Sequence, residues 1–143
     1  KRCEWNRTYR NTATIHTDGG ARGNPGPAGI GVVIEAGGET HRFKEFIGHA
    51  TNNQAEYRAV LLGMQAAKRL GLDELNFVLD AELVVMQLRR EYKIKDPELG
   101  KLFVQIWNLS LEFSQVTYRH VPRAQNREAD KLVNEAIDAG TAQ

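Results

Sequence analysis

The chain has 143 residues, of which 41% are hydrophobic and 26% charged, and its formal net charge is +1. This composition excludes a disordered chain and is typical of one globular domain with a sizeable core. No apolar run approaches the roughly 20 residues of a membrane helix, and no leader resembles a signal peptide. Cys3 is the only cysteine, which excludes an internal disulfide and favours a reducing, cytoplasmic compartment.

The first strand is expected over residues 13–18, where apolar and polar side chains alternate. Residues 1–12 show no clear period, and we interpret them as a lead-in to a single domain over residues 13–143. The glycines and prolines of residues 19–27 predict a turn that cannot continue the strand. Asp18 is therefore expected at the mouth of a strand, beside backbone that lets a ligand come close.

Two further strands are expected over residues 29–36 and from about 39 to 48, with a hairpin at residues 37–38. Three consecutive strands joined by short turns make an antiparallel meander. The period then changes to that of a helix over residues 53–70, which Gly71 ends. The candidate caps for its start are Thr51, Asn52 and Asn53.

The second half of the chain alternates strands and helices. We expect a strand over residues 75–79, helices over 81–90 and 97–113, a strand over 116–121 and a last helix ending near 139. The predicted fold class is α/β, with a mixed five-stranded sheet in the order β-β-β-α-β-α-α-β-α, flanked by helices. Asp80 should lie at the carboxyl end of its strand, where open sheets of this kind bind ligands.

Four acids occupy positions that solvation alone does not explain. Asp18 and Asp80 end strands, whereas Glu56 and Asp130 lie on the apolar faces of helices. An unpaired acid costs several kcal/mol to bury, by order of magnitude, unless a cation or hydrogen bonds meet it. Each has a structural alternative: an Asx turn at Asp18, a helix cap at Asp80, and helix-dipole stabilisation for the other two.

Together the four acids predict a site for hard divalent cations, Mg²⁺ or Mn²⁺, because every donor is an oxygen. Two such cations about 3.5–4 Å apart can activate a water, neutralise a phosphate and stabilise a leaving oxygen. One carboxylate must bridge them, and we assign that role to Asp18.

Four blocks of this chain resemble the type 1 ribonuclease H family, whose fold is ribonuclease H-like. They are residues 17–27 (TDGGARGNPGP), 51–57 (TNNQAEY), 79–85 (LDAELVV) and 120–130 (HVPRAQNREAD), in the family's order. The resemblance implies an endonuclease that cuts the RNA strand of RNA/DNA hybrids with two Mg²⁺ ions, Mn²⁺ being able to substitute. The expected products carry 5′-phosphate and 3′-hydroxyl ends, and the expected partner is the hybrid, with a monomeric enzyme and no membrane.

The resemblance also assigns residues. The metal-binding and catalytic acids fall on Asp18, Glu56, Asp80 and Asp130. The family's mobile histidine, which helps protonate the leaving group or release product, falls on His120; its alternative is a solvent-facing strand end. The residues implied in substrate binding are Gly19, Asn24, Thr51, Asn52 and Asn53, and their alternative roles are turn formation and helix capping.

The sequence departs from the family's pattern in three places. Ala81 replaces a frequent Ser, so a hydroxyl is lost near the metals, and Glu82 replaces a frequent amide, which could weaken hybrid binding. A long basic insertion found in some members is reduced here to the cations of residues 89–101, with a solvated face as the alternative. They are Arg89, Arg90, Lys93, Lys95 and Lys101.

Three other functions fit parts of the pattern. One is the ribonuclease H domain of a larger reverse transcriptase, an alternative prompted by a chain that starts at Lys1 rather than Met. Another is a module of the same fold that binds hybrids or double-stranded RNA without cleaving, which the four acids disfavour. A DNA-cutting integrase or transposase relative fits the asparagine pair at residues 52–53 and the His120 block less well.

Overall fold

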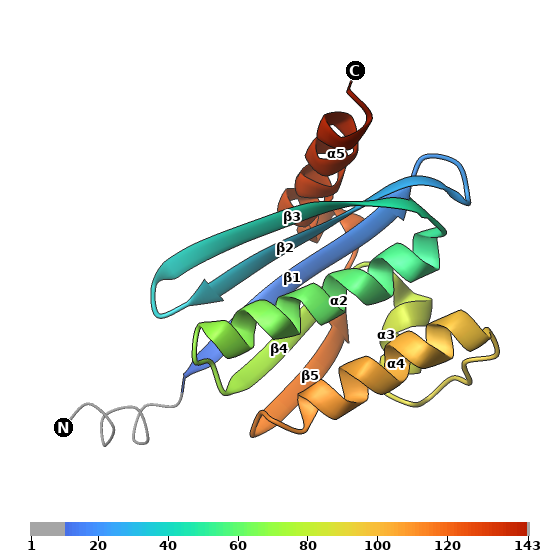
Figure 1. Ribbon diagram of the computed structural model, residues 1–143. Coiled ribbons are helices and arrows are strands. Elements are labelled where there is room, and N and C mark those ends of the chain that lie inside the picture. Colours follow the sequence, from blue (N-terminus) through green and yellow to red (C-terminus); the bar gives the residue numbers. More distant parts are fainter. Residues whose placement is uncertain (1–10, 143) are drawn as a thin grey trace.

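The computed structural model describes residues 11–142, whose five strands form one sheet in the order β3-β2-β1-β4-β5. The first three strands form the expected antiparallel meander, and β4 and β5 continue the sheet in parallel with β1. The predicted α/β class and element order are confirmed (Figure 1). The strands are β1 (Thr12–Ala21), β2 (Gly26–Ala36), β3 (Glu39–Ala50), β4 (Glu74–Leu79) and β5 (Gln115–His120).

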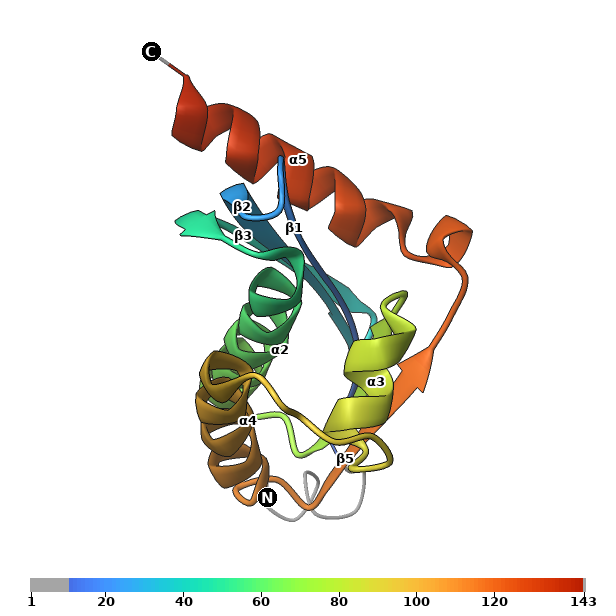
Figure 2. The same ribbon diagram turned by 90° about the vertical axis from the view of Figure 1, so that its right-hand side faces the viewer.

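Helices cover both faces of this sheet. On one face α5 packs against β1, β2 and β3. On the other face α2 packs against β1 and β2, and α4 packs against α2 (Figure 2). The main core lies between the sheet and α2, α3 and α4. The helices are α2 (Asn52–Arg69), α3 (Glu82–Leu88), α4 (Pro97–Ser110) and α5 (Arg127–Thr141), with a 3₁₀ turn, η1 (Arg123–Gln125).

Local signals set the ends of α2. Of the three candidate caps, Thr51 is the N-cap: its hydroxyl accepts from the Gln54 N–H at 3.1 Å. The Gln54 side chain returns a bond to the Thr51 N–H at 2.9 Å, which completes a capping box. Gly71 follows the helix with φ +74°, the left-handed conformation that glycine adopts most easily.

The prediction that β1 ends at Asp18 is wrong. The strand continues through Gly19 and Gly20, which pair with Ile30 and Gly29 of β2. A Cβ on Gly19 would lie 2.3 Å from the carbonyl oxygen of Ala55, so glycine is needed here for α2 to pack closely. Asp18 thus lies inside a strand, opposite Gly31, and the alternative of an Asx turn is excluded.

The predictions for α3 and α4 were too long. Helix α4 ends at Ser110 rather than Phe113, and residues 111–114 turn into β5. The helical pattern predicts six buried side chains here: Leu99, Leu102, Phe103, Ile106, Trp107 and Leu109. Of these, only Leu99 and Ile106 are buried, and Trp107 is 39% exposed. Helix α3 stops at Leu88, and residues 89–96 form a loop, here called the basic loop, that holds four of the five cations of residues 89–101.

The expected lead-in lies mostly outside the described residues. Residues 1–10 are not described, and Thr12 already belongs to β1. Among the described residues, no helix combines the length and apolar character needed to span a bilayer.

Candidate active site

Asp18 and Asp80 are brought together by neighbouring parallel strands. Strands β1 and β4 lie side by side, yet the chain leaves β1 towards β2 and β3 and leaves β4 towards β5. At such a switch point the carboxyl ends of the two strands part and leave a crevice. The ladder between β1 and β4 ends at the pair His16–Val78, so Asp18 and Asp80 line the opening beyond it. The expectation for Asp80 is confirmed.

Glu56 enters the same crevice from the second turn of α2. It is 8% exposed, and its Oε1 is buried without a hydrogen-bond partner among the described residues. One carboxylate oxygen each from Asp18, Glu56 and Asp80 lie within 4.8 Å of one another. Three acids from three separate elements therefore present oxygens to one small volume.

Asp130 lies at the rim of this cluster. It lines the same pocket, of about 410 Å³, from the first turn of α5, but it is not one of the three closely grouped acids. Its Oδ1 lies 3.5 Å from the Nη2 of Arg123, and its side chain is 32% exposed. All four predicted acids thus line one pocket, with three at its centre.

Two acids of this pocket, Asp18 and Glu56, have a raised pKa and hold protons more tightly than ordinary carboxyl groups. Burial, followed by the charge of Asp80 and then by contact with Asp130, raises the pKa of Asp18 to about 8. Burial and the charges of Asp18 and Asp80 raise the pKa of Glu56 well above its usual range. Crowded, buried carboxylates favour any species that brings positive charge among them, whether protons or metal cations.

Oxygen donors of this kind suit a hard divalent cation. The buried, unpartnered Glu56 Oε1 lies in the group that offers three oxygens at close range, which is the arrangement that such an ion requires. Asp18, Glu56 and Asp80 are therefore the residues that could hold a metal.

Of the polar residues expected to bind substrate, Asn52 lines the carboxylate pocket and Asn24, Thr51 and Asn53 adjoin Asn52; we call these four residues the polar wall. The Asn24 side-chain oxygen accepts from the Asn52 N–H at 2.9 Å, and the Asn52 side-chain oxygen accepts from the Ala21 N–H at 2.8 Å. Their amide nitrogens have no hydrogen-bond partner among residues 11–142 and remain free to donate. Asn53 is exposed in the first turn of α2. Gly19 lines the pocket itself.

The structure does not place His120 against the acids. It is the last residue of β5, is exposed, and does not line the carboxylate pocket. Its register partner on β4 is Leu79, the residue before Asp80, so its backbone lies beside the carboxyl end of β4.

Sequence reasoning missed two arginines of this pocket. Arg22 lies in the turn after β1 and pairs with Asp138 of α5 at 2.8 Å, and Arg123 lies in the turn before α5. Arg22 lies in the sequence block that contains Asp18, and Arg123 in the block that contains Asp130. Their places in these blocks could have identified them. The structural alternative for Asp80, a helix cap, is excluded: Ala81 is the N-cap of α3 and supplies no side-chain bond.

The basic loop has internal partners. Arg89 pairs with Glu91 at 3.0 Å, and the Arg90 guanidinium lies 4.7 Å from the centre of the Trp107 ring. Lys93 and Lys95 are exposed, which agrees with the alternative of a solvated face.

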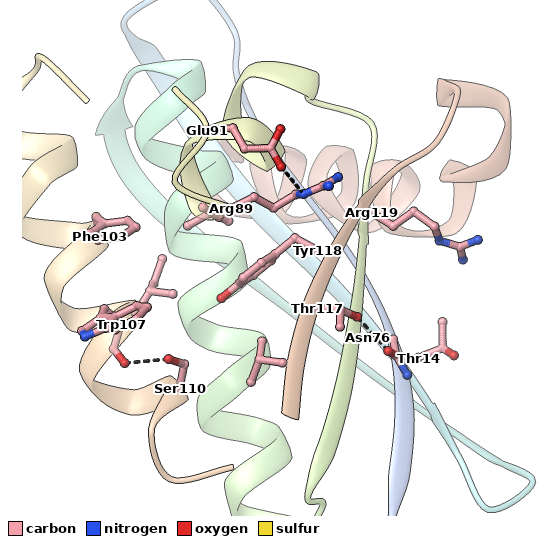
Figure 3. Close-up of a pocket in the computed structure, with 13 residues that line it drawn as sticks. Thr14, Asn76, Arg89, Glu91, Phe103, Trp107, Ser110, Thr117, Tyr118 and Arg119 are labelled. Carbon is pink, nitrogen blue, oxygen red and sulfur yellow. Dashed lines mark hydrogen bonds and ion pairs between the residues drawn. The ribbon is translucent and has the colours of Figure 1, made fainter. Parts of the chain in front are cut away.

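A second hollow, larger than the carboxylate pocket, runs along β5, the edge strand of the sheet. Its volume is about 830 Å³, and residues from both faces of the strand line it (Figure 3). Tyr118 points towards Phe103 and Trp107 of α4, whereas Thr117 points the other way and bonds Asn76 at 2.7 Å. The hollow contains none of the four acids.

Comparison with known proteins gives consistent matches over most of the chain. The model of the family described as reverse transcriptase-like matches residues 16–136. The bifunctional protein Rv2228c of Mycobacterium tuberculosis is 45% identical over 128 residues, which are 87% of this chain and 35% of that protein. The chain therefore spans about a third of the length of the curated relatives of this group.

Two further matches cover nearly the whole of the related protein. A ribonuclease H of Hydrogenovibrio crunogenus is 30% identical over 138 residues, covering 87% of this chain and 94% of that protein. The crystal structure of LC11-RNase H1 in complex with an RNA/DNA hybrid superposes with a TM-score of 0.87 at 43% identity. The match covers 91% of this chain and 99% of that one.

Proposed function

Because the chain belongs to the ribonuclease H family, within the reverse transcriptase-like group, we propose that it is an endonuclease that hydrolyses the RNA strand of RNA/DNA hybrids. The carboxylate cluster carries this proposal, since three acids, two of them buried and the third half-buried, share one small volume without an evident structural use. The hybrid bound to LC11-RNase H1 supports the substrate. The products carry 5′-phosphate and 3′-hydroxyl ends, and residues 13–143 form the catalytic domain.

Asp18, Glu56 and Asp80 hold Mg²⁺ in this proposal, and Asp130 completes the site from its rim. Mn²⁺ is able to substitute, because it also prefers oxygen donors. When bound, two such ions supply an activated water and stabilise the charge on the phosphate and on the leaving oxygen. Asp18 would contribute to holding both ions, because it interacts with each of the other three acids.

The polar wall beside the cluster selects RNA over DNA. The free amide nitrogens of Asn24 and Asn52 are donors for the 2′-hydroxyls that an A-like duplex displays in its shallow minor groove. Their side-chain oxygens are already bonded, so both amides are held in one orientation before substrate arrives. Thr51 and Asn53 extend this surface at the start of α2. A role for His120 in product release, a monomeric state and a cytoplasmic location stay predictions.

The proposal is tested with an end-labelled RNA/DNA hybrid in Mg²⁺. We expect the RNA strand to be cut internally, and neither double-stranded RNA nor DNA of the same sequence to be cut. Chelation of the metal with EDTA should abolish the reaction. A protein that binds the hybrid in Mg²⁺ and Mn²⁺ and leaves it intact would instead be a binding module of the same fold.

A further inference from the structure

The start of α5 is tied to β1 by one buried carboxamide. Asn126 precedes α5, is 1% exposed and makes no capping bond with its side chain. Its Nδ2 donates to the carbonyl oxygen of Thr17 at 2.9 Å, and its Oδ1 accepts from the Nδ1 of His16 at 3.2 Å. Because both ends of the amide are used, its orientation is fixed.

This contact occurs where the sheet divides. Residues 12–16 of β1 pair with β4. Thr17, the next residue, has no register partner on β4. Thr17 is fully buried, and a buried carbonyl without a donor is costly. The Asn126 side chain supplies a donor at that point.

The same residue links two of the acids. Thr17 directly precedes Asp18, and the backbone carbonyl of Asn126 accepts from the Asp130 N–H at 3.2 Å. Asn126 therefore fixes the backbone on both sides of the pocket, although it does not line the pocket itself. Asp130 is the acid that stands apart from the close group, so its distance from that group depends on where α5 begins.

We infer that Asn126, with its amide oriented by His16, is a positioning residue that sets the separation of Asp130 from Asp18. The inference rests on the proposed function, because it assigns Asn126 a role in assembling that metal site.

Helix α5 has other attachments that should keep it docked without Asn126. Ala129 is fully buried and packs on Gly31, where a Cβ would lie 2.5 Å from the Ala129 carbonyl oxygen. Glu135 of α5 also pairs with Lys44 of β3 at 3.0 Å. Replacement of Asn126 should therefore shift the start of the helix while the fold is kept.

Four variants test the inference. Asn126→Ala removes both bonds, His16→Phe keeps the ring shape without the donor, His16→Gln restores an N–H donor, and a double variant combines the first two. The matched control is Thr117→Val, which removes one side-chain bond of 2.7 Å on the same sheet, away from the acids. We measure kcat and KM for the hybrid in Mg²⁺, Mn²⁺ affinity without substrate by calorimetry, and Tm.

We expect Asn126→Ala to lower kcat by about 10- to 100-fold and to weaken Mn²⁺ binding, with KM unchanged. His16→Phe should show a smaller loss in the same direction, and His16→Gln should recover it. The double variant should be no worse than Asn126→Ala, because His16 acts through Asn126. Thr117→Val should lower Tm and keep the wild-type kcat.

The inference is overturned if Asn126→Ala matches Thr117→Val in kcat and Mn²⁺ affinity, or if the losses from Asn126 and His16 multiply in the double variant. Should Asn126→Ala fail to fold, equal kcat and Mn²⁺ affinity in His16→Phe and His16→Gln would overturn it. Failure of the wild type to cut any hybrid would refute the proposed function instead. The Mn²⁺ affinities would then still decide whether Asn126 sets the site.

Discussion

The carboxylate pocket and the hollow along β5 differ in a way that size does not reveal. The hollow is about twice as large, at about 830 Å³ against about 410 Å³. Several of its polar groups are paired within the protein: Arg89 with Glu91, and Thr117 with Asn76. In the smaller pocket like charges are crowded together, and Glu56 Oε1 has no partner among the described residues.

This difference indicates which of the two hollows is the candidate active site. Burying an unpaired acid costs free energy, which a bound cation or proton offsets. A hollow whose polar groups are paired and whose walls are aromatic has no such cost and requires no ligand. The smaller pocket therefore calls for cations, and the larger one is consistent with packing at a sheet edge. Changes to the two regions should have opposite effects on activity and stability.

The largest effect is expected from Asp18→Asn. The amide removes the negative charge on which the bridging role depends, so the hybrid cleavage rate should fall by orders of magnitude. The fold should be kept, because the substitution also removes a buried like charge. Single-turnover cleavage and circular dichroism test both parts, and activity at the wild-type level would refute the assignment.

A second test uses stability without substrate. The pKa of Asp18 is raised from 3.8 to about 8, so between these values the folded state binds more protons than the unfolded chain. The free energy of unfolding should therefore fall as pH rises from about 4 to about 8 in EDTA. Mg²⁺ should restore stability at the upper end, where it replaces the lost protons.

Urea unfolding at the two ends of this pH range, with EDTA or Mg²⁺, measures the effect. Asp18→Asn is the matched variant and should show a flatter pH dependence and a smaller gain from Mg²⁺. A wild-type stability that does not change with pH or metal would contradict the account of the pocket.

The opposite pattern is expected in the hollow. Trp107→Ala removes the stacking with Phe103 and the Arg90 cation, which should cost about 1–2 kcal/mol of unfolding free energy. The rate of hybrid cleavage should stay unchanged. Chemical denaturation and the cleavage assay give the two values, and a large loss of cleavage in a folded Trp107→Ala protein would show that the hollow belongs to the active surface.

The smallest effect concerns Ala81, which lines the carboxylate pocket at the start of α3. Ala81 is the N-cap of α3 without a side-chain bond, so Ala81→Ser should add one and stabilise the protein by roughly 0.5–1 kcal/mol. The expected change in cleavage is modest, since no metal ligand is altered. A drop in the unfolding free energy would show that a serine cannot cap α3 here.

Sequence patterns were sufficient for the order of elements and for the four acids of the pocket. Strand alternation and the helical period were strong signals, and the acids stood out because burial of an acid on an apolar face needs a reason. The pattern was misleading at Gly19, where glycine serves close packing of α2 against β1 rather than a turn. Side-chain burial in α4 also could not be predicted, because periodicity does not tell which neighbour covers a helix.

Contacts between distant segments were beyond the reach of the pattern. The bonds of Asn126 to Thr17 and His16 join residues more than 100 positions apart, and nothing local to residue 126 indicates them. The rim position of Asp130 likewise depends on how α5 docks on β2, which only the tertiary structure shows.

The most direct measurement is an anomalous difference map from crystals of the wild-type protein grown with Mn²⁺. We predict a peak among the carboxylates of Asp18, Glu56 and Asp80, within coordination distance of their oxygens. A well-ordered site with no anomalous density at saturating Mn²⁺, or Mn²⁺ bound elsewhere while these three acids stay free, would contradict it.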